Sequence, residues 1–386
     1  MASPLQSDKI RRAVSCADTG QAVSELAMSL QADENDLVLC FAGQNHDPEK
    51  LEALFQEYFG DTRLVACRSA GEITPQGYFD NSLTAVVLPA AHFTAEITRL
   101  DELQTASLGT ASETAIKAYK NLQTRISDGF SSKNCFAMLL IDGLSQREET
   151  IAAGLSLGLT GMPMFGGSSA DSLDYKDAWI YHQHAMHSDT AVLILIHTML
   201  PFRVFKTEHF TCTSETYIAT SVNARKRIIM EVDGYPAAQW YANTVGVDIS
   251  DLSADVFSRN PVTVCSGGKT YVRSIQCIEE NQGLRFYCAI NEGMVLHLGR
   301  RSNLVENLRD RLTSIADEVG EIELLIGCDC TLRNLEAKKD KLMPELDRLF
   351  RKYNGIGFAT FGEQHNGIHI NQTFTGVAIG SDAGTD

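Results

Sequence analysis

Blocks of apolar and polar positions alternate along the chain. Continuous apolar runs, several of which end on a glycine or an acidic residue, predict buried strands at 36–42, 63–67, 83–88, 135–141 and 191–196. Apolar residues spaced three or four positions apart predict helices at 8–30, 48–59, 109–125 and 148–159. Strands that alternate with helices in this way are typical of an α/β protein.

The order strand, helix, strand, strand occurs three times, near 36–88, 134–197 and 321–379. In each copy the second strand leads to a small residue and then a carboxylate, at Glu72, Asp171 and Glu363. Repeated units usually pack against one another, so we predict mixed sheets with flanking helices, built from internally repeated units. The alternative is chance similarity, because glycine and an acidic residue after a strand also form an ordinary turn.

Residues 203–300, between the second and third copies, have a different pattern of short strands separated by Gly, Asn and Glu. No low-complexity linker precedes this segment, which favours tight docking. We therefore predict two docked domains, residues 1–205 with two repeated halves and residues 206–386.

Net charge narrows the possible partners. The 386 residues carry a formal charge of −16, which argues against nucleic acid or an anionic membrane surface as the main partner. The apolar run from Ala191 to Ile196 is far shorter than the ~20 residues of a membrane span. The first twelve residues are polar, unlike a secretory leader. We expect a cytoplasmic protein with reduced cysteines.

Signatures of enzymes are missing from the sequence. It has no P-loop, no dinucleotide-binding glycine motif between a strand and a helix, no Gly-x-Ser-x-Gly elbow and no His-Glu-x-x-His helix. We predict that the chain is not an enzyme. The alternative is acid–base chemistry by carboxylates at the strand ends.

Polar residues after apolar strands mark a candidate ligand site, because the loops at strand ends of an α/β sheet form a crevice. The third copy contributes Glu363, Arg333 and Asn371, and the first contributes Glu72. Charge and hydrogen bonds from these four side chains suit a small polar ligand such as an amino acid.

Cys328 and Cys330 lie two positions apart at the end of a predicted strand and would face the same side. They could hold zinc or iron in a metal or redox sensor. Two thiols supply only half of a closed zinc site, so a buried thiol pair is the alternative.

Several motifs resemble the FIST family. The run Ala66-Cys67-Arg68-Ser69-Ala70-Gly71-Glu72-Ile73 resembles the signature of the FIST N-terminal domain. The FIST C-terminal domain is matched by Gly327-Cys328, Arg333, Phe361-Gly362-Glu363 and Asn371-Gln372-Thr373. Five runs resemble the nitric-oxide-sensing NosP branch of the family: 141–149, 205–210, 271–276, 292–296 and 327–336.

The resemblance implies a sensory signal-transduction protein. The resemblance to the NosP branch implies haem as the cofactor and nitric oxide as the ligand. It also implies a histidine kinase or a cyclic-di-GMP enzyme as the partner. A homo-oligomer is a further possibility. The alternatives are a haem-free FIST sensor of a small polar ligand and the cysteine-based metal or redox sensor.

A haem site would need an axial histidine in an apolar cleft. His369 alternates with two isoleucines and would face away from both in a strand, and His209 is flanked by Phe210. His182 and His187 lie near a predicted hairpin tip and would serve only if the tip closes over the pocket. All four histidines remain candidates.

Overall fold

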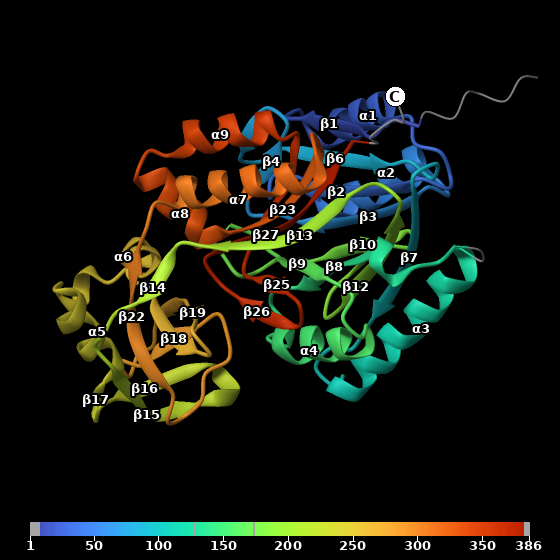
Figure 1. Ribbon diagram of the computed structural model, residues 1–386. Coiled ribbons are helices and arrows are strands. Elements are labelled where there is room, and N and C mark those ends of the chain that lie inside the picture. Colours follow the sequence, from blue (N-terminus) through green and yellow to red (C-terminus); the bar gives the residue numbers. More distant parts are fainter. Residues whose placement is uncertain (1–7, 127–128, 173, 382–386) are drawn as a thin grey trace, which may run out of the picture.

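A computed structural model describes residues 8–126, 129–172 and 174–381 (Figure 1). The predicted α/β class, with mixed sheets, flanking helices and repeated units, is confirmed. Within these ranges no helix is long and apolar enough to cross a membrane. Residues 1–7, which carry part of the argument against a leader, lie outside them.

The first unit shows the repeated plan. Its elements are β1 (Arg11–Ser15), α1 (Thr19–Leu30), β2 (Leu37–Ala42), α2 (Pro48–Phe59), β3 (Arg63–Arg68), the hairpin β4 (Glu72–Thr74) and β5 (Gly77–Phe79), and β6 (Leu83–Leu88). The parallel pair β2–β3 lies beside β6, and β1 is the outer strand. The helix predicted at 8–30 is wrong at its start, because 11–15 pair with β6 and Asp18 caps α1.

The other two units follow the same plan. The second contains β7 (Phe93–Leu100), α3 (Leu108–Ile126), a 3₁₀ turn (Ser132–Asn134), β8 (Cys135–Asp142), α4 (Glu148–Gly158), β9 (Met164–Ser169), β10 (Ile180–His182), β11 (Ala185–His187) and β12 (Ala191–Thr198). The third contains β13 (Phe202–Glu208), α7 (Leu304–Val319), β23 (Ile322–Cys330), α8 (Thr331–Lys339), α9 (Met343–Lys352), β24 (Gly355–Thr360), β25 (Glu363–His365), β26 (Ile368–Ile370) and β27 (Thr373–Gly380).

Each unit gives its hairpin to the sheet of another unit. The sheet orders are β1-β6-β2-β3-β10-β11, β7-β12-β8-β9-β25-β26 and β13-β27-β23-β24-β4-β5. The second unit therefore completes the first sheet, the third completes the second, and the first completes the third. This closed exchange ties both predicted domains into one body.

The three sheets share one central core. Their inner faces meet, so that Phe41 of β2 stacks on Phe358 of β24 with ring centroids 4.8 Å apart. Helices cover the outer faces and make a separate apolar layer for each unit. Because both faces of each sheet are covered, the central strands consist of continuous apolar residues.

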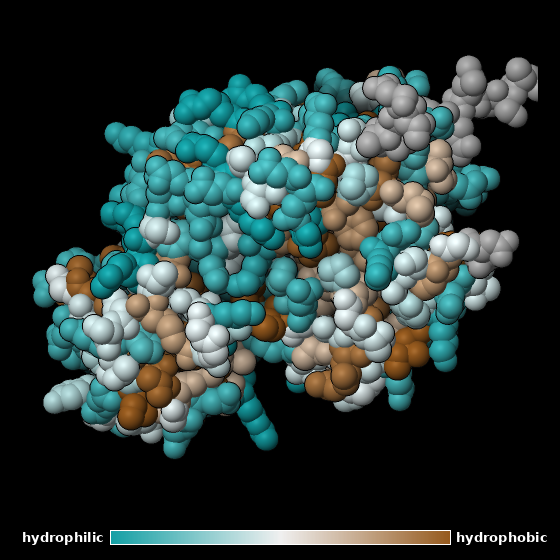
Figure 2. Space-filling view, in the orientation of Figure 1, coloured by the Kyte–Doolittle hydropathy of each residue, from teal (hydrophilic) through white to brown (hydrophobic). Residues whose placement is uncertain are grey.

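Residues 210–301, between β13 and α7, form a separate body that we call the insert. It contains β14 (Phe210–Cys212), β15 (Tyr217–Asn223), 3₁₀ turns (Ala224–Lys226 and Ile249–Asp251), β16 (Ile228–Val232), β17 (Tyr235–Pro236), α5 (Ala237–Val245), α6 (Ala254–Arg259), β18 (Val262–Ser266), β19 (Lys269–Arg273), β20 (Ile275–Ile278), β21 (Leu284–Phe286) and β22 (Val295–Arg301). Its core is its own. In Figure 2 it stands out at the lower left of a mostly hydrophilic surface.

Candidate functional site

A cavity of about 530 Å³ lies where the insert meets the second and third units. We call it the interdomain cavity. The second unit contributes the turn after β8 and the start of α4, the third unit contributes the turn after β24, and the insert contributes β20 and β21. Its lining residues are Gly143, Leu144, Gln146, Glu148, Tyr175, Arg227, Gln276, Cys277, Arg285, Phe286, Tyr287 and Phe361.

Three aromatic rings from the three parts of the molecule form one wall of the interdomain cavity. Tyr175 lies 5.0 Å from Phe361 and Tyr287 lies 6.2 Å from Phe361, measured between ring centroids. The hydroxyls of Tyr175 and Tyr287 are hydrogen-bonded to each other. Burial raises the pKa of Tyr175 to about 12, so both hydroxyls stay neutral at physiological pH.

A buried ion-pair network joins the insert to α4 beside this wall. Arg227 Nη2 donates to Glu148 Oε2 at 2.7 Å and to Glu149 Oε2 at 2.6 Å. Its Nη1 donates to the carbonyl oxygen of Tyr287 at 2.5 Å, and Glu149 Oε1 accepts from the Ala289 amide at 2.5 Å. Losing one partner would leave an uncompensated buried charge.

Two carboxyl groups, of Glu148 and Glu149, share the single guanidinium of Arg227 in this network. Burial opposes ionisation of Glu149, but nearby His369 and Arg227 together hold its pKa below the ordinary value. Of the other polar groups of the wall, Cys277 is an exposed thiol, and Arg285 is half-buried and paired with Glu279 at 2.6 Å. The cavity thus combines an acidic end, a basic rim and an aromatic wall.

Glu72 and Glu363 are fully buried and serve the returning strands of their own units. The backbone amide and hydroxyl of Ser82 donate to Glu72 Oε2, and those of Thr373 donate to Glu363 Oε2. Burial raises the pKa of Glu72 to about 7 and that of Glu363 to about 8. Neither side chain lines the interdomain cavity.

Arg333 and Asn371 are also buried. Arg333 Nη1 donates to Asp329 Oδ1 at 2.7 Å, and its guanidinium lies over the ring of Phe374. Asn371 Nδ2 donates to the carbonyl of Phe361 at 3.4 Å, directly behind the cavity wall. The structure therefore places Asn371 behind the wall residue Phe361, and it places Glu363 and Arg333 within the third unit, outside the cavity lining.

Two of the four histidines are deeply buried: His209 lies between β13 and β14, and His369 lies on β26. The His209 ring bonds Glu336 through Nε2 at 2.8 Å, which occupies that nitrogen. The Nδ1 atom of His369 lies 3.2 Å from Gln364, and its Nε2 has no partner among the described residues. A Cβ at Gly362 would lie 2.3 Å from the His369 ring, so the ring is packed against backbone.

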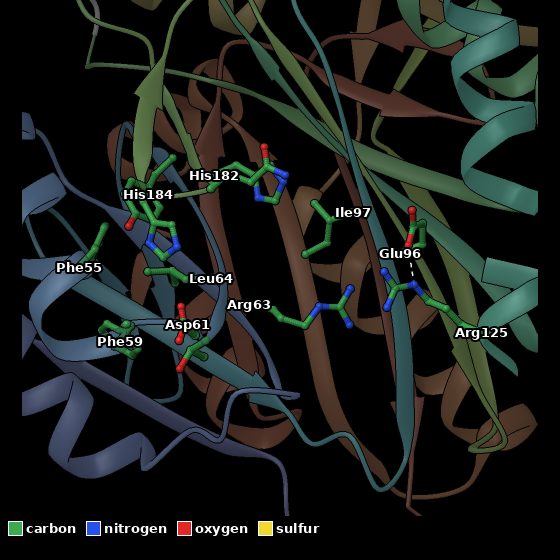
Figure 3. A pocket seen from close by; sticks show the side chains of 14 residues that line it. Phe55, Phe59, Asp61, Arg63, Leu64, Glu96, Ile97, Arg125, His182 and His184 are labelled. Carbon is green, nitrogen blue, oxygen red and sulfur yellow. Dashed lines mark hydrogen bonds and ion pairs between the residues drawn. The ribbon is translucent and has the colours of Figure 1, made fainter. Parts of the chain in front are cut away.

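The other two lie on the hairpin β10–β11, but only His182 is beside its turn, because His187 pairs with Ile180 at the opposite end and the predicted place at the tip is wrong for it. His182 lines a separate pocket of about 240 Å³ with Arg63, Glu96 and Arg125 (Figure 3). Burial, helped by nearby Arg99, lowers the pKa of His182 to about 4. His187 does not line this pocket, and Nε2 of its ring contacts Arg99 and the carbonyl of His182.

Among the described residues, only His182 of these four histidines lines either of the two pockets considered so far. The pocket at His182 is polar and smaller than the roughly 300–1,000 Å³ typical of organic ligand sites, and neither His209 nor His369 lines it or the interdomain cavity. The interdomain cavity has the volume, but no histidine is among its lining residues.

Cys328 and Cys330 are both fully buried on β23, and Cys328 lies in the central core. Within the described residues neither belongs to a group of three side chains able to share a metal. A different group, Cys212, Cys265 and His297, does.

The sequence did not single out Arg227, Tyr175 or Tyr287. Arg227 is 79 positions away from Glu148 in the chain, so no local pattern reveals their pairing. The available signal was indirect: the strand β8 ends at Asp142, and α4 begins shortly afterwards with Glu148, which places an acidic helix start near a strand end.

Three α/β units that exchange hairpins, with an insert beside a cavity, define the architecture of the described chain. A model of the FIST N domain matches residues 36–235, and a model of the FIST C domain matches residues 237–366. The chain belongs to the FIST family of sensory signalling proteins. The matched ranges meet later in the chain than the predicted border at 205/206, which stays a prediction.

Comparisons with curated proteins and with solved structures do not extend the family assignment. No curated protein matches the chain. Among solved structures, a crystal structure of a cyanuric acid hydrolase from A. caulinodans aligns with 97% of this chain and 100% of that chain, at 8% identity and a TM-score of 0.36. A likeness at this level carries no argument about fold or activity.

Proposed function

We propose that this FIST protein senses a small zwitterionic ligand, of the size of an amino acid, in the interdomain cavity. The observation that carries the proposal is the meeting of an aromatic wall and the Arg227–Glu148–Glu149 network at the junction of three parts of the molecule. Pockets that combine apolar walls with a few convergent polar groups are typical ligand sites.

The wall suggests how such a ligand is recognised. Its ammonium group would face the carboxyl group of Glu148, and its carboxylate would face Arg285, both of which line the cavity. The side chain would pack on Phe361 and Tyr287. Gln276 supplies a neutral donor and acceptor on the same strand as Cys277.

Signalling would follow from the position of the cavity. A ligand that contacts both the insert and α4 favours the conformation in which they are close, and the shift is limited by its preference for that conformation. The proposed output is a partner histidine kinase or cyclic-di-GMP enzyme, as the family resemblance implies, in the cytoplasm.

Calorimetric titration with each common amino acid tests the proposal. We expect at least one to bind with one site per chain, and Arg285→Ala to weaken it by about tenfold or more, the effect of removing one charge-assisted hydrogen bond. Arg125→Ala, in the pocket at the β10–β11 hairpin, is the matched control and should bind normally. Absence of binding by every amino acid, or equal binding by Arg285→Ala, would contradict the proposal.

Haem-based sensing of nitric oxide is the second candidate. What favours it is the free Cys277 thiol in the wall of the same cavity, because a cysteine thiolate is one of the protein ligands that hold haem iron. Haemin titration separates the two functions. If the wild-type protein shifts the Soret band of haemin and Cys277→Ser does not, the result would support haem binding. If the wild-type protein leaves the spectrum of free haemin unchanged, haem-based sensing would be refuted.

A further inference from the structure

The insert joins the third unit through two adjacent strands. The chain enters the insert along β14 and leaves along β22, and these strands pair with Cys212 opposite Gly299 (Figure 1). At the base of this stem, Glu336 of α8 bonds both His209 and Arg301. The stem therefore sets the angle at which the insert lies over the rest of the molecule.

A group of three metal-binding side chains lies on this stem. Cys212 is on β14, His297 is on β22 and Cys265 is on the neighbouring strand β18. Their ligand atoms all lie within 4.8 Å of one another, and no other such group was found among the described residues. In this structure the two cysteines form a disulfide with Cα atoms 6.5 Å apart, so the expectation of reduced cysteines is wrong for this pair.

The histidine is held ready to act as a ligand. His297 Nδ1 lies 3.0 Å from the carbonyl oxygen of Thr213. A carbonyl only accepts hydrogen bonds, so in the neutral ring Nδ1 carries the proton and Nε2 has the free lone pair. A backbone carbonyl behind a histidine is the usual outer partner of a metal-ligating imidazole.

We propose that, when the disulfide is reduced, Cys212, Cys265 and His297 bind a thiophilic divalent cation, zinc by preference. Two equivalents of a small thiol such as glutathione convert the disulfide into two cysteine thiols and yield one glutathione disulfide. Zinc then displaces one proton from each thiol. With Zn–S distances of about 2.3 Å, tetrahedral thiolates stand roughly 3.8 Å apart, so the two sulfur atoms move apart once the disulfide is reduced.

The site has one open coordination position and is reachable from solvent. Two thiolates and one imidazole leave the fourth tetrahedral position for water or an external ligand. Cys265 is exposed, and Cys212 and His297 are half-buried. Because the disulfide and the metal need the same sulfur atoms, the stem has two mutually exclusive locked states.

Cobalt and zinc titrations of the full-length protein test this site. The protein is reduced with a phosphine, freed of metal with a chelator and titrated anaerobically with Co²⁺, then with Zn²⁺ in competition with a chromophoric chelator. We expect one equivalent of Co²⁺ with thiolate charge-transfer and tetrahedral d–d absorption, displaced by Zn²⁺. Protein that keeps its disulfide should bind none.

Variants separate this site from other thiols. Cys265→Ser and His297→Ala should each weaken zinc binding by more than about 100-fold, the upper range for loss of an outer-sphere partner alone. Cys16→Ser, which changes an exposed cysteine of the first unit, is the control and should bind normally. Circular dichroism verifies that each variant is folded. Binding that persists in a folded Cys265→Ser variant, or no binding by folded, reduced wild-type protein, would overturn the proposal.

Discussion

The first and third units carry a buried glutamate at the residue that begins the exchanged hairpin, whereas the second unit carries an isoleucine there. The hairpins of the first and third units begin with Glu72 and Glu363, and each glutamate accepts bonds from the residue ten positions later. The second hairpin begins with Ile180, and there the corresponding Thr190 bonds Asp101 and the Leu100 carbonyl instead. One backbone plan thus tolerates either a buried carboxyl or an apolar side chain, provided that every nearby donor has an acceptor.

The largest effect should come from removing the carboxyl of the third unit. Glu363→Ala leaves the Thr373 amide and the hydroxyls of Thr373 and Thr360 without their acceptor and opens a small void. We expect a loss of about 3 kcal/mol in the free energy of unfolding, measured by urea titration. Glu363→Gln keeps an acceptor and should lose about 1 kcal/mol. Equal stability of both variants and the wild type would refute this role.

The reverse change in the second unit should be nearly as costly. Ile180→Glu buries a carboxyl where the Thr190 hydroxyl is already committed to Asp101. The expected loss is about 2–3 kcal/mol, because a buried polar group without a partner is unfavourable. Ile180→Val, which removes only one methyl group, should cost about 1 kcal/mol. A stable Ile180→Glu protein would mean that the three positions are equivalent after all.

The pH dependence should distinguish the same positions. Burial raises the pKa of Glu363 from 4.5 to about 8, so the folded state prefers the neutral carboxyl. Its contribution to stability is complete below pH 4.5 and decreases as the pH rises towards 8. The slope reaches about 1.4 kcal/mol per pH unit. Between pH 6.5 and 8, Glu363→Gln should therefore lose less stability than the wild type, and parallel curves would disprove the raised pKa.

The smallest effect is expected at Thr190. Thr190→Val removes one hydroxyl that bonds Asp101 at 2.8 Å, which should cost about 1 kcal/mol. Because the Thr190 hydroxyl does not bond Glu363, the slope of stability between pH 6.5 and 8 should match that of the wild type. Thr373→Val, by contrast, should change that slope.

Sequence reasoning succeeded where local patterning reflects burial. The run 37–42 is apolar at every position because both faces of its sheet are covered, and its strand was predicted. The edge strand 11–15 was mistaken for helix, because its apolar residues also fit a helical spacing until Asp18 caps α1. The strand 93–100 and the helix 304–319 were not predicted.

The candidate site was the harder part. The cavity does lie at strand ends, but the polar side chains predicted there are buried inside their units, as Glu363 is. Arg227 and Tyr287 come from the insert and reach the second unit only through the tertiary fold. Pairings between such distant segments leave no periodic signal in one sequence.

The exchange of hairpins also has a consequence for the nascent chain. Strand β9 is complete once residue 169 has been made, yet its sheet partner β25 begins only at residue 363. At ~5–20 residues per second, that edge stays unpaired for on the order of ten seconds or more. An unpaired inner strand is a template for pairing with other chains. The ribosome-bound protein would therefore need protection by a chaperone during this interval, although the finished fold leaves β9 covered on both sides.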